Sequence, residues 1–283
     1  MKLEAQEALE KEREIGPAIY SGILSQPDLF SAVVEHVTNV LAGPSTNFRT
    51  VLEPPAVMRL FQEQLTQEDK ETIVLDIMAS AIRKPCNQGS AMKVIMFNAG
   101  FHALVCYRVA HRLWLAGRKG LAYLIQSSVS STFSCDIHPG AKIGAGIYLA
   151  AGAGVVIGET AVVKDDVSIF QGVTLGGTGK DRGDRHPKIG QGVILQDSAV
   201  VLGNIVVGEW AVITAKSIVL KDVPPMARVS GIPAKVKSYR NSGNYLKHLS
   251  GKQDSGFDDW EADWMTIETR QIFLKAFLKK NGK

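Results

Sequence analysis

An aliphatic residue returns at nearly every sixth position between residues 137 and 223. The three runs are Ile137, Ile143 and Leu149; then Ile157, Val163, Ile169 and Leu175; and then Ile189, Leu195, Val201, Val207, Ile213 and Val219. A period of six fits neither the 3.6-residue period of a helix nor the two-residue alternation of a strand, so each repeat is interpreted as one short strand and one corner. Stacked repeats of this kind form a parallel β-helix with the aliphatic anchors inside, and a register this long argues against chance spacing in ordinary strands.

Apolar residues outside the repeat follow helical spacing. Spacings of three and four predict helices over residues 3–42 with a break at 25–28, over a segment that follows Pro54 and Pro55, over 67–82 with Thr66 as N-cap, and over 92–126 with a break at 117–120. After the repeat, a Gly-, Ser- and Lys-rich linker precedes a segment whose apolar residues, from Trp260 to Phe277, lie near one helical face. This tail is expected to pack on its own domain or, alternatively, to bind a partner or lock an oligomer.

These patterns predict an α+β protein in three parts. Residues 1–134 form an all-helical oligomerisation domain, residues 135–238 form the β-helix, and residues 239–283 form the linker and an amphipathic C-terminal helix. Within the β-helix, the register of six is lost over residues 176–188, whose sequence is GGTGKDRGDRHPK. Insertions into stacked coils loop out from a corner, and the glycines and cations of this loop suit a phosphate or carboxylate, although a solvated charged loop is the alternative.

Composition excludes several classes of function. The formal net charge is +4 with scattered basic residues, which gives no support for nucleic-acid binding. The longest apolar run, Val94 to Tyr107, is interrupted by Asn98 and His102 and is too short to cross a membrane. Residues 1–14 lack the apolar core of a signal peptide, so a cytoplasmic protein is expected. Three unclustered cysteines indicate neither a disulfide framework nor a metal site.

Several longer motifs connect the chain with a known family. They are GFHAL at 100–104, YRVAH at 107–111, DIHP at 136–139, VIGETAV at 156–162, VTLGGTGK at 173–180 and GDRHPKI at 183–189. With these motifs the sequence resembles the serine O-acetyltransferases, which make O-acetylserine from serine and acetyl-CoA; the match is loose over the early helices and close from about Met92 to Lys235. The resemblance implies a left-handed β-helix, trimers formed through it and hexamers formed through the helical domains. It implies no permanently bound cofactor, and acetyl-CoA or another acyl-CoA as cosubstrate.

The chain departs from this family on the acceptor side. The family carries an Asp-His pair in which His is the general base for the serine hydroxyl and Asp helps to hold serine, whereas this chain has Ala150 and Ala151. A further serine-holding Asp of the family corresponds to Lys84, and Asp136, which in the family orients the catalytic His, is left without its partner. A positioned base contributes on the order of a hundred- to ten-thousand-fold to the rate, and alanine cannot accept a proton. Little acetylation of serine is therefore expected, and Lys84 favours an anionic acceptor.

Other candidate residues follow from the same resemblance. His186 is the best remaining candidate base, because its loop contacts the acceptor in the family, where His186 and Arg185 correspond to binding residues. Five residues are candidates for CoA binding: Gly177, Thr178 and Ala215 near the pantetheine arm, and Lys216 and Lys221 for a phosphate, with plain solvated charge as the alternative for the lysines. The Gly-Ala-Gly corner usual in the family is replaced by Gln196-Asp197-Ser198, which is expected to narrow the groove.

Three hypotheses of function follow. The chain is a divergent CoA-dependent acyltransferase with an altered, anionic acceptor; or it is a pseudoenzyme that acts as a ligand-binding or oligomeric scaffold; or it is a serine acetyltransferase inactivated at Ala150 and Ala151 by mutagenesis, which Lys84 disfavours. A homotrimer or hexamer is expected, with apolar residues such as Val155, Ile194 and Val206 on the outer faces. Many family members end in an isoleucine carboxylate that enters the sulfhydrylase of the next step, whereas this chain ends in KKNGK, so the cysteine synthase complex is not expected.

Overall fold

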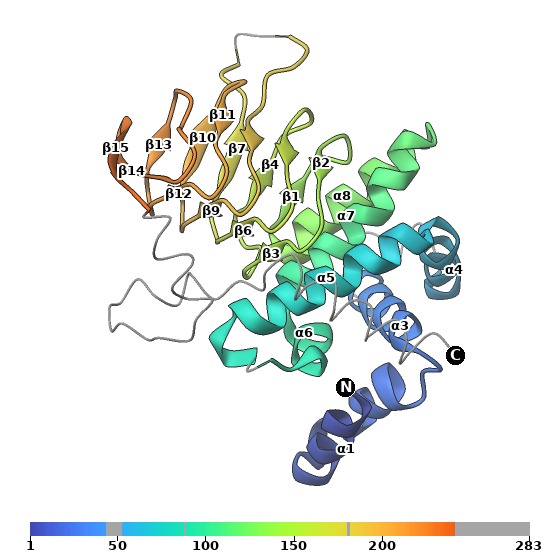
Figure 1. Ribbon diagram of the computed structural model, residues 1–283. Helices are drawn as coiled ribbons and strands as arrows, with labels where there is room; N and C mark the ends of the chain where they lie inside the picture. The colour runs from blue at the N-terminus through green and yellow to red at the C-terminus, as the bar shows by residue number, and fades with distance from the viewer. Residues whose placement is uncertain (44–52, 88, 180–181, 241–283) are drawn as a thin grey trace.

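The computed structural model describes residues 1–43, 53–87, 89–179 and 182–240, and it consists of a helical part followed by a prism of short strands (Figure 1). The helical elements are α1 (Lys2–Lys11), η1 (Arg13–Ile15), α2 (Gly16–Ile19), η2 (Tyr20–Leu24), α3 (Leu29–Leu41), α4 (Pro54–Gln64), α5 (Gln67–Arg83), η3 (Pro85–Asn87), α6 (Ala91–Phe97), α7 (Ala99–Leu115) and α8 (Lys119–Phe133). The predicted linker and tail helix lie outside the described residues.

The predicted helix boundaries are largely confirmed by their caps. Thr66 caps α5 in a capping box, because its hydroxyl accepts a hydrogen bond from the Asp69 N–H while the Asp69 carboxylate accepts one from the Thr66 N–H. The break at 25–28 ends in Asp28, whose carboxylate caps α3 by accepting a hydrogen bond from the Ser31 N–H at 2.7 Å.

The apolar spacing does not reveal a break at Asn98, which divides the helix predicted over 92–126. The Asn98 side chain accepts a hydrogen bond from the Phe101 N–H at 3.2 Å and so begins α7. Gly100 then lies against the first coil of the prism, where an added Cβ would stand 2.1 Å from the Leu149 carbonyl oxygen and 2.4 Å from that of Ala150. Glycine permits this approach, and it fixes the start of α7 against the coil that carries residues 150 and 151.

The repeat forms a left-handed β-helix. Its strands are β1 (Asp136–Ile137), β2 (Lys142–Ile143), β3 (Tyr148–Leu149), β4 (Val156–Ile157), β5 (Val162–Val163), β6 (Ser168–Ile169), β7 (Thr174–Gly176), β8 (Lys188–Ile189), β9 (Ile194–Leu195), β10 (Val200–Leu202), β11 (Val206–Val207), β12 (Val212–Ile213), β13 (Ile218–Val219), β14 (Ala227–Gly231) and β15 (Ala234–Tyr239). Each strand from β1 to β10 pairs in parallel with the third strand after it, and β14 pairs in parallel with β12 and antiparallel with β15. The predicted anchors are buried, apart from the half-buried Ile143.

Three sheets form the sides of the prism. The first sheet has the order β1-β4-β7-β10-β13, the second β11-β8-β5-β2, and the third β15-β14-β12-β9-β6-β3. The corner between the first and second sheets, here called the loop corner, carries residues 138–141, 158–161 and 177–187. The corner between the third and first sheets, here called the alanine corner, carries residues 150–155, 170–173, 196–199 and 214–217.

The helices cover the open edge of the first coil. β1, β2 and β3 are edge strands, whose free backbone groups need partners. The Tyr107 hydroxyl donates to the Ala141 carbonyl at 2.6 Å, and Asp76 Oδ1 accepts a hydrogen bond from the Ile147 N–H at 2.9 Å. Buried residues of α3 to α8 and of the coils form one continuous apolar core. The helical part is therefore a cap that the β-helix requires at this end.

The prediction of exposed apolar residues on the outer faces of the β-helix is only partly correct. Val206 is 52% exposed, but Val155 is 0% and Ile194 is 3% exposed. Val155 lies two positions before the inward-facing anchor Ile157 and shares its inner face, as Val167 and Val173 do before Ile169 and Leu175.

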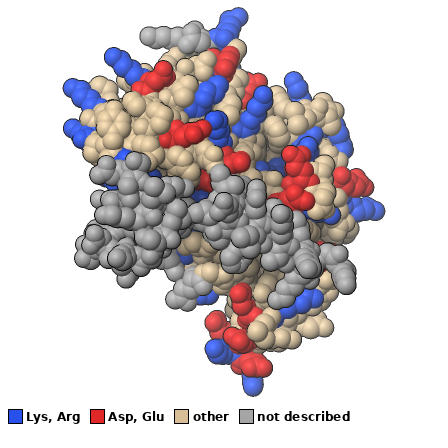
Figure 2. Space-filling model, viewed as in Figure 1, with Lys and Arg blue, Asp and Glu red and all other residues tan. Residues whose placement is uncertain are grey.

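The described surface mixes charges of both signs. Figure 2 shows Lys and Arg interspersed with Asp and Glu over the described part of this face. None of the described helices is both long and apolar enough to span a membrane.

A buried histidine in the helical core is expected to make the fold sensitive to acid. His102 Nε2 lies 2.6 Å from the Ile95 carbonyl oxygen, and the His36 ring is 5.1 Å away. Burial lowers the pKa of His102 from 6.5 to about 4. As pH falls from 6.5 to 4, the unfolded chain takes up a proton that the folded chain does not, so roughly 2–3 kcal/mol of stability should be lost. Urea unfolding at pH 7 and pH 4.5 measures this loss, and it should shrink in His102→Asn; an unchanged loss in that variant would contradict the assignment.

Candidate functional site

The alanine corner is apolar where the family resemblance places a catalytic pair. Ala150 is 5% exposed and packs with Ala79 of α5, Tyr148 and Phe170, which together are called here the apolar cluster. The Tyr148 and Phe170 rings are perpendicular, with centroids 5.8 Å apart. Ala151 follows and is exposed. Neither alanine can take a proton, and the cluster surrounds position 150 with hydrocarbon.

Lys84 is held beside the third sheet by its neighbour in sequence. Arg83 ends α5 and is buried, and its guanidinium donates to the Val167 carbonyl at 3.1 Å and to the Ser168 hydroxyl at 3.3 Å. Ser168 belongs to β6, the neighbour of the strand that carries Tyr148. Lys84 is half-buried directly after this anchor. Sequence reasoning missed the anchoring role of Arg83, because its partners lie more than 80 positions away.

Asp136 has a partner other than a histidine. Gln126 of α8 donates from Nε2 to Asp136 Oδ1 at 2.6 Å. The carboxylate at the start of β1 therefore acts as a structural acceptor between α8 and the first sheet.

Thr160, which the sequence reasoning did not single out, fixes the tautomer of His186. The Thr160 N–H donates to His186 Nδ1 at 3.2 Å, and the Thr160 hydroxyl oxygen lies 2.8 Å from the same nitrogen. That oxygen accepts hydrogen bonds from the backbone N–H groups of Arg185 and His186. Nδ1 is therefore an acceptor, and the neutral ring carries its proton on Nε2.

The surroundings of His186 keep it neutral. The ring lies so close to Gly158 that an added Cβ there would stand 2.1 Å from ring atoms. Burial lowers the pKa of His186, and the nearby charges of Arg185 and Lys188 lower it further. Near pH 7 the side chain thus offers an Nε2–H donor, which suits a binding role better than that of a general base.

The cations of the loop corner already have acidic partners. Arg185 Nη2 donates to Glu159 at 3.0 Å, and this guanidinium lowers the pKa of Glu159. Lys188 pairs with Asp184 and also donates to the Thr160 carbonyl at 2.8 Å. An anion that binds Arg185 must therefore compete with Glu159.

The candidate residues do not converge within one chain. Lys84 follows α5 beside the third sheet, and Ala150 and Ala151 belong to the alanine corner, whereas Arg185 and His186 belong to the loop corner. The width of the first sheet separates the two corners.

The CoA candidates are divided in the same way. Gly177 and Thr178 follow β7 at the loop corner, whereas Ala215 and Lys216 lie exposed at the alanine corner, with Lys221 just after β13. The corner Gln196-Asp197-Ser198, which replaces the family's Gly-Ala-Gly, stabilises the next coil, because the Gln196 side chain accepts a hydrogen bond from the Ala215 N–H at 3.2 Å.

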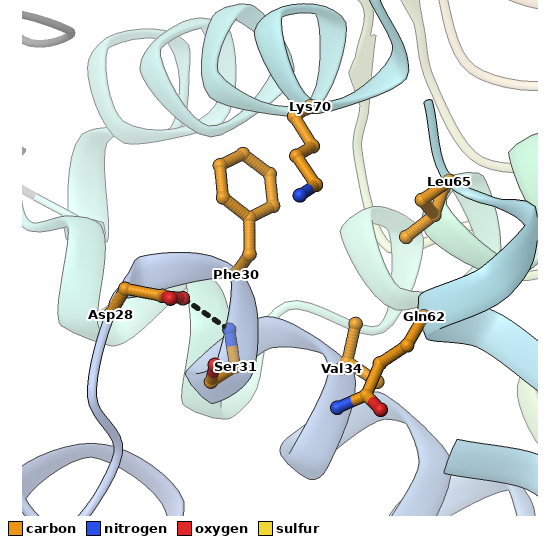
Figure 3. A pocket seen from close by; sticks show the side chains of 7 residues that line it. All are labelled: Asp28, Phe30, Ser31, Val34, Gln62, Leu65 and Lys70. Atoms are coloured by element: carbon orange, nitrogen blue, oxygen red, sulfur yellow. Dashed lines mark hydrogen bonds between the residues drawn. The ribbon is translucent and has the colours of Figure 1, made fainter. Parts of the chain in front are cut away.

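A hollow in the helical part lies apart from both corners. It is lined by Asp28, Phe30, Ser31, Val34, Gln62, Leu65 and Lys70 (Figure 3). Asp28 points to the Ser31 N–H that it caps, and Lys70 Nζ lies 5.4 Å from the Phe30 ring centroid. Its charged groups therefore stabilise the ends and contacts of the helices.

Comparison with known proteins identifies the family. Residues 1–106 match the family described as serine acetyltransferase, N-terminal. The chain is 42% identical over 239 residues to the serine acetyltransferase of Escherichia coli K12, covering 83% of this chain and 85% of the relative. It is 44% identical over 255 residues to serine acetyltransferase 2 of Arabidopsis thaliana, covering 89% and 76%. The chain belongs to the serine acetyltransferase family.

Solved structures of serine acetyltransferases share the fold. The Brucella abortus enzyme in complex with coenzyme A superposes with a TM-score of 0.80 at 41% identity, over 85% of this chain and 94% of that chain. A serine acetyltransferase in complex with cysteine also gives a TM-score of 0.80, at 39% identity, over 85% and 92%. The predicted helical part and left-handed β-helix are thereby confirmed.

Proposed function

We propose that the chain is an acyl-CoA-dependent acyltransferase of the serine acetyltransferase family whose acceptor site is no longer built for serine. The observation that carries the proposal is the packing of Ala150 in the apolar cluster beside the exposed Ala151. Residues 150 and 151 provide neither a base for a serine hydroxyl nor a carboxylate for a serine ammonium. Lys84 adds a positive charge near the third sheet, which favours a small anionic acceptor. Similarity to the Brucella abortus enzyme with coenzyme A supports acyl-CoA as the donor.

We infer that the acceptor itself supplies the base. His186 presents an Nε2–H because Thr160 occupies Nδ1. This donor can hold an acceptor carboxylate or carbonyl, and it is available without protonation of the ring. An acceptor with its own amine or neighbouring carboxylate would not need the missing histidine.

We infer that the working unit is at least a homotrimer. The loop corner and the alanine corner are separated within one chain, so the loop corner of a neighbouring chain is needed beside Lys84 and Ala151 to complete one site. Val156 of the first sheet and Val206 of the second are 39% and 52% exposed, and both would gain cover in such an assembly. Pairing of trimers through the helical domains would give the hexamer that the family resemblance implies.

A scaffold without turnover is the second candidate. It is favoured by the Arg185–Glu159 and Lys188–Asp184 pairs, which already neutralise cations of the loop corner. In this case the β-helix would serve oligomerisation, and no acyl-CoA would bind.

Calorimetry with acetyl-CoA is expected to show saturable binding. A dissociation constant in the range of about 1 μM to 1 mM is expected, which is the usual range of substrate affinities for enzymes. Lys216→Ala with Lys221→Ala should weaken binding several-fold, because exposed cations each contribute up to about 1 kcal/mol to an ionic contact.

Lys142→Ala is the matched control, since this lysine is exposed on β2 at the other end of the prism. No heat change at millimolar acetyl-CoA would refute the transferase proposal and favour the scaffold.

A further inference from the structure

A second hollow of the helical part lies between α4 and the turn that leads into α8. Its volume is about 240 Å³, and it shares no lining residue with the loop corner, the alanine corner or the hollow of Figure 3. Four of its residues recur at positions i, i+3, i+4 and i+7 of α4, so they lie on one face of that helix. The residues that line it are Ala56, Arg59, Leu60, Glu63, Arg118 and Leu121.

The three charged side chains of this hollow have no protein partner. Over the described ranges, the side chains of Arg59, Glu63 and Arg118 form no ion pair and no hydrogen bond, and all three residues are exposed. Glu63 follows Arg59 by four positions, a spacing at which opposite charges on a helix can pair, yet these two do not. By contrast, Arg112 at the end of α7 pairs with Asp69 at 2.8 Å. The hollow therefore offers two guanidiniums and one carboxylate to a ligand.

The floor of the hollow is apolar. Leu60 is 8% exposed and belongs to the main core, and Leu121 packs against the same core. Ala56 adds a half-buried methyl group on the same face of α4. An aliphatic group that covered this floor would remove apolar surface from water. Pockets for drug-sized ligands measure about 300–1,000 Å³, so this smaller hollow suits a ligand of few heavy atoms.

Two cations, one anion and an apolar floor together match a small zwitterion. Guanidinium groups bind a carboxylate through parallel hydrogen bonds, and a glutamate carboxylate accepts hydrogen bonds from an ammonium group. We propose that this hollow binds a free α-amino acid with a small aliphatic side chain. Its carboxylate lies between Arg59 and Arg118, its ammonium faces Glu63, and its side chain covers Leu60 and Leu121. The site goes beyond the proposed acyl transfer and does not depend on it.

L-Valine is the probe, in a ligand-detected NMR titration of the full-length chain. Saturable binding with a dissociation constant of roughly 0.1–10 mM is expected, because so few heavy atoms limit the affinity. 3-Methylbutanoate is valine without its ammonium group, and valinamide is valine without its carboxylate. Each should bind about tenfold more weakly than valine, which is the effect of losing one charge-assisted hydrogen-bonded contact.

Substitutions in the hollow assign each contact. Arg59→Gln and Arg118→Gln should each weaken valine binding about tenfold. Glu63→Gln should weaken valine binding without weakening that of 3-methylbutanoate, because only valine carries an ammonium group. Because these three side chains are exposed and unpaired, the melting temperature should not change, which separates binding from folding.

Arg185→Gln is the matched control, because it removes a guanidinium at the loop corner, and it should leave valine binding unchanged. Valine binding that survives both arginine substitutions in the hollow, or that is lost in Arg185→Gln, would overturn the proposal. So would the absence of saturable valine binding to the unaltered chain up to about 10 mM. Equal affinities for valine and 3-methylbutanoate would show that Glu63 holds no ammonium group and would overturn the assignment to an amino acid.

Discussion

Acetyl-CoA consumption with L-serine is expected to be about 10²- to 10⁴-fold slower than in an active serine acetyltransferase such as the Escherichia coli relative, which is the contribution of a positioned general base. Ala151 offers no proton acceptor, and His186 is held by Thr160 with its proton on Nε2. Thiol release from acetyl-CoA measures the rate for both proteins under the same conditions. Turnover comparable to that of the relative would show that another group acts as the base.

Restoring the missing groups should show which of them matters. Ala151→His with Lys84→Asp is expected to recover part of the activity, because position 151 is exposed and can hold an imidazole without displacing a neighbour. Adding Ala150→Asp should lower the melting temperature, because the new carboxylate would enter the apolar cluster beside Tyr148 and Phe170. If the first pair recovers nothing while acetyl-CoA still binds, the acceptor side has lost more than its base.

The repeat was the most predictable part of the fold. Each anchor contributes the same inward-facing aliphatic side chain to the same kind of corner, so a purely local pattern determines the stack. The role of Thr66 as an N-cap could also be predicted from the sequence, because a capping box is complete within four residues. The role of Asn98 could not be predicted, because the apolar spacing continues across it and a single Asn within a helical pattern does not show whether it caps a helix.

The site was less predictable because its geometry depends on contacts between distant residues. Thr160 lies 26 positions from His186, and Arg83 lies 85 positions from Ser168. Val155 was expected on the outside, but it lies two positions before the anchor Ile157 and faces inward with it. The separation of the two corners follows from which sheet each strand joins, and this was not visible in the motifs themselves.

The buried pair between α5 and α7 is expected to show the largest effect on stability. Asp76 is 0% exposed, and its carboxylate accepts hydrogen bonds from Arg108 Nε at 2.8 Å and from the Ile147 N–H at 2.9 Å. Arg108 also donates to the Gly144 carbonyl at 2.9 Å. Asp76→Ala should lower the free energy of unfolding by about 3–5 kcal/mol, because it leaves a buried guanidinium without its carboxylate. Urea unfolding measures the change.

Glu68→Ala is the matched control, because Glu68 pairs with Arg112 at the surface, where an ion pair contributes about 0–1 kcal/mol.

The double variant Asp76→Leu with Arg108→Met replaces both members of the buried pair. It separates the neutralisation of the two charges by each other from their hydrogen bonds to the first coil. If the two charges only neutralised each other, replacing both by apolar residues would cost little stability. This pair also satisfies the Ile147 N–H and the Gly144 carbonyl at the edge of the first coil, and each unsatisfied buried group costs about 1–3 kcal/mol. The double variant should therefore remain destabilised by at least about 2 kcal/mol, and full recovery of stability would show that the helical part does not cap the β-helix through these residues.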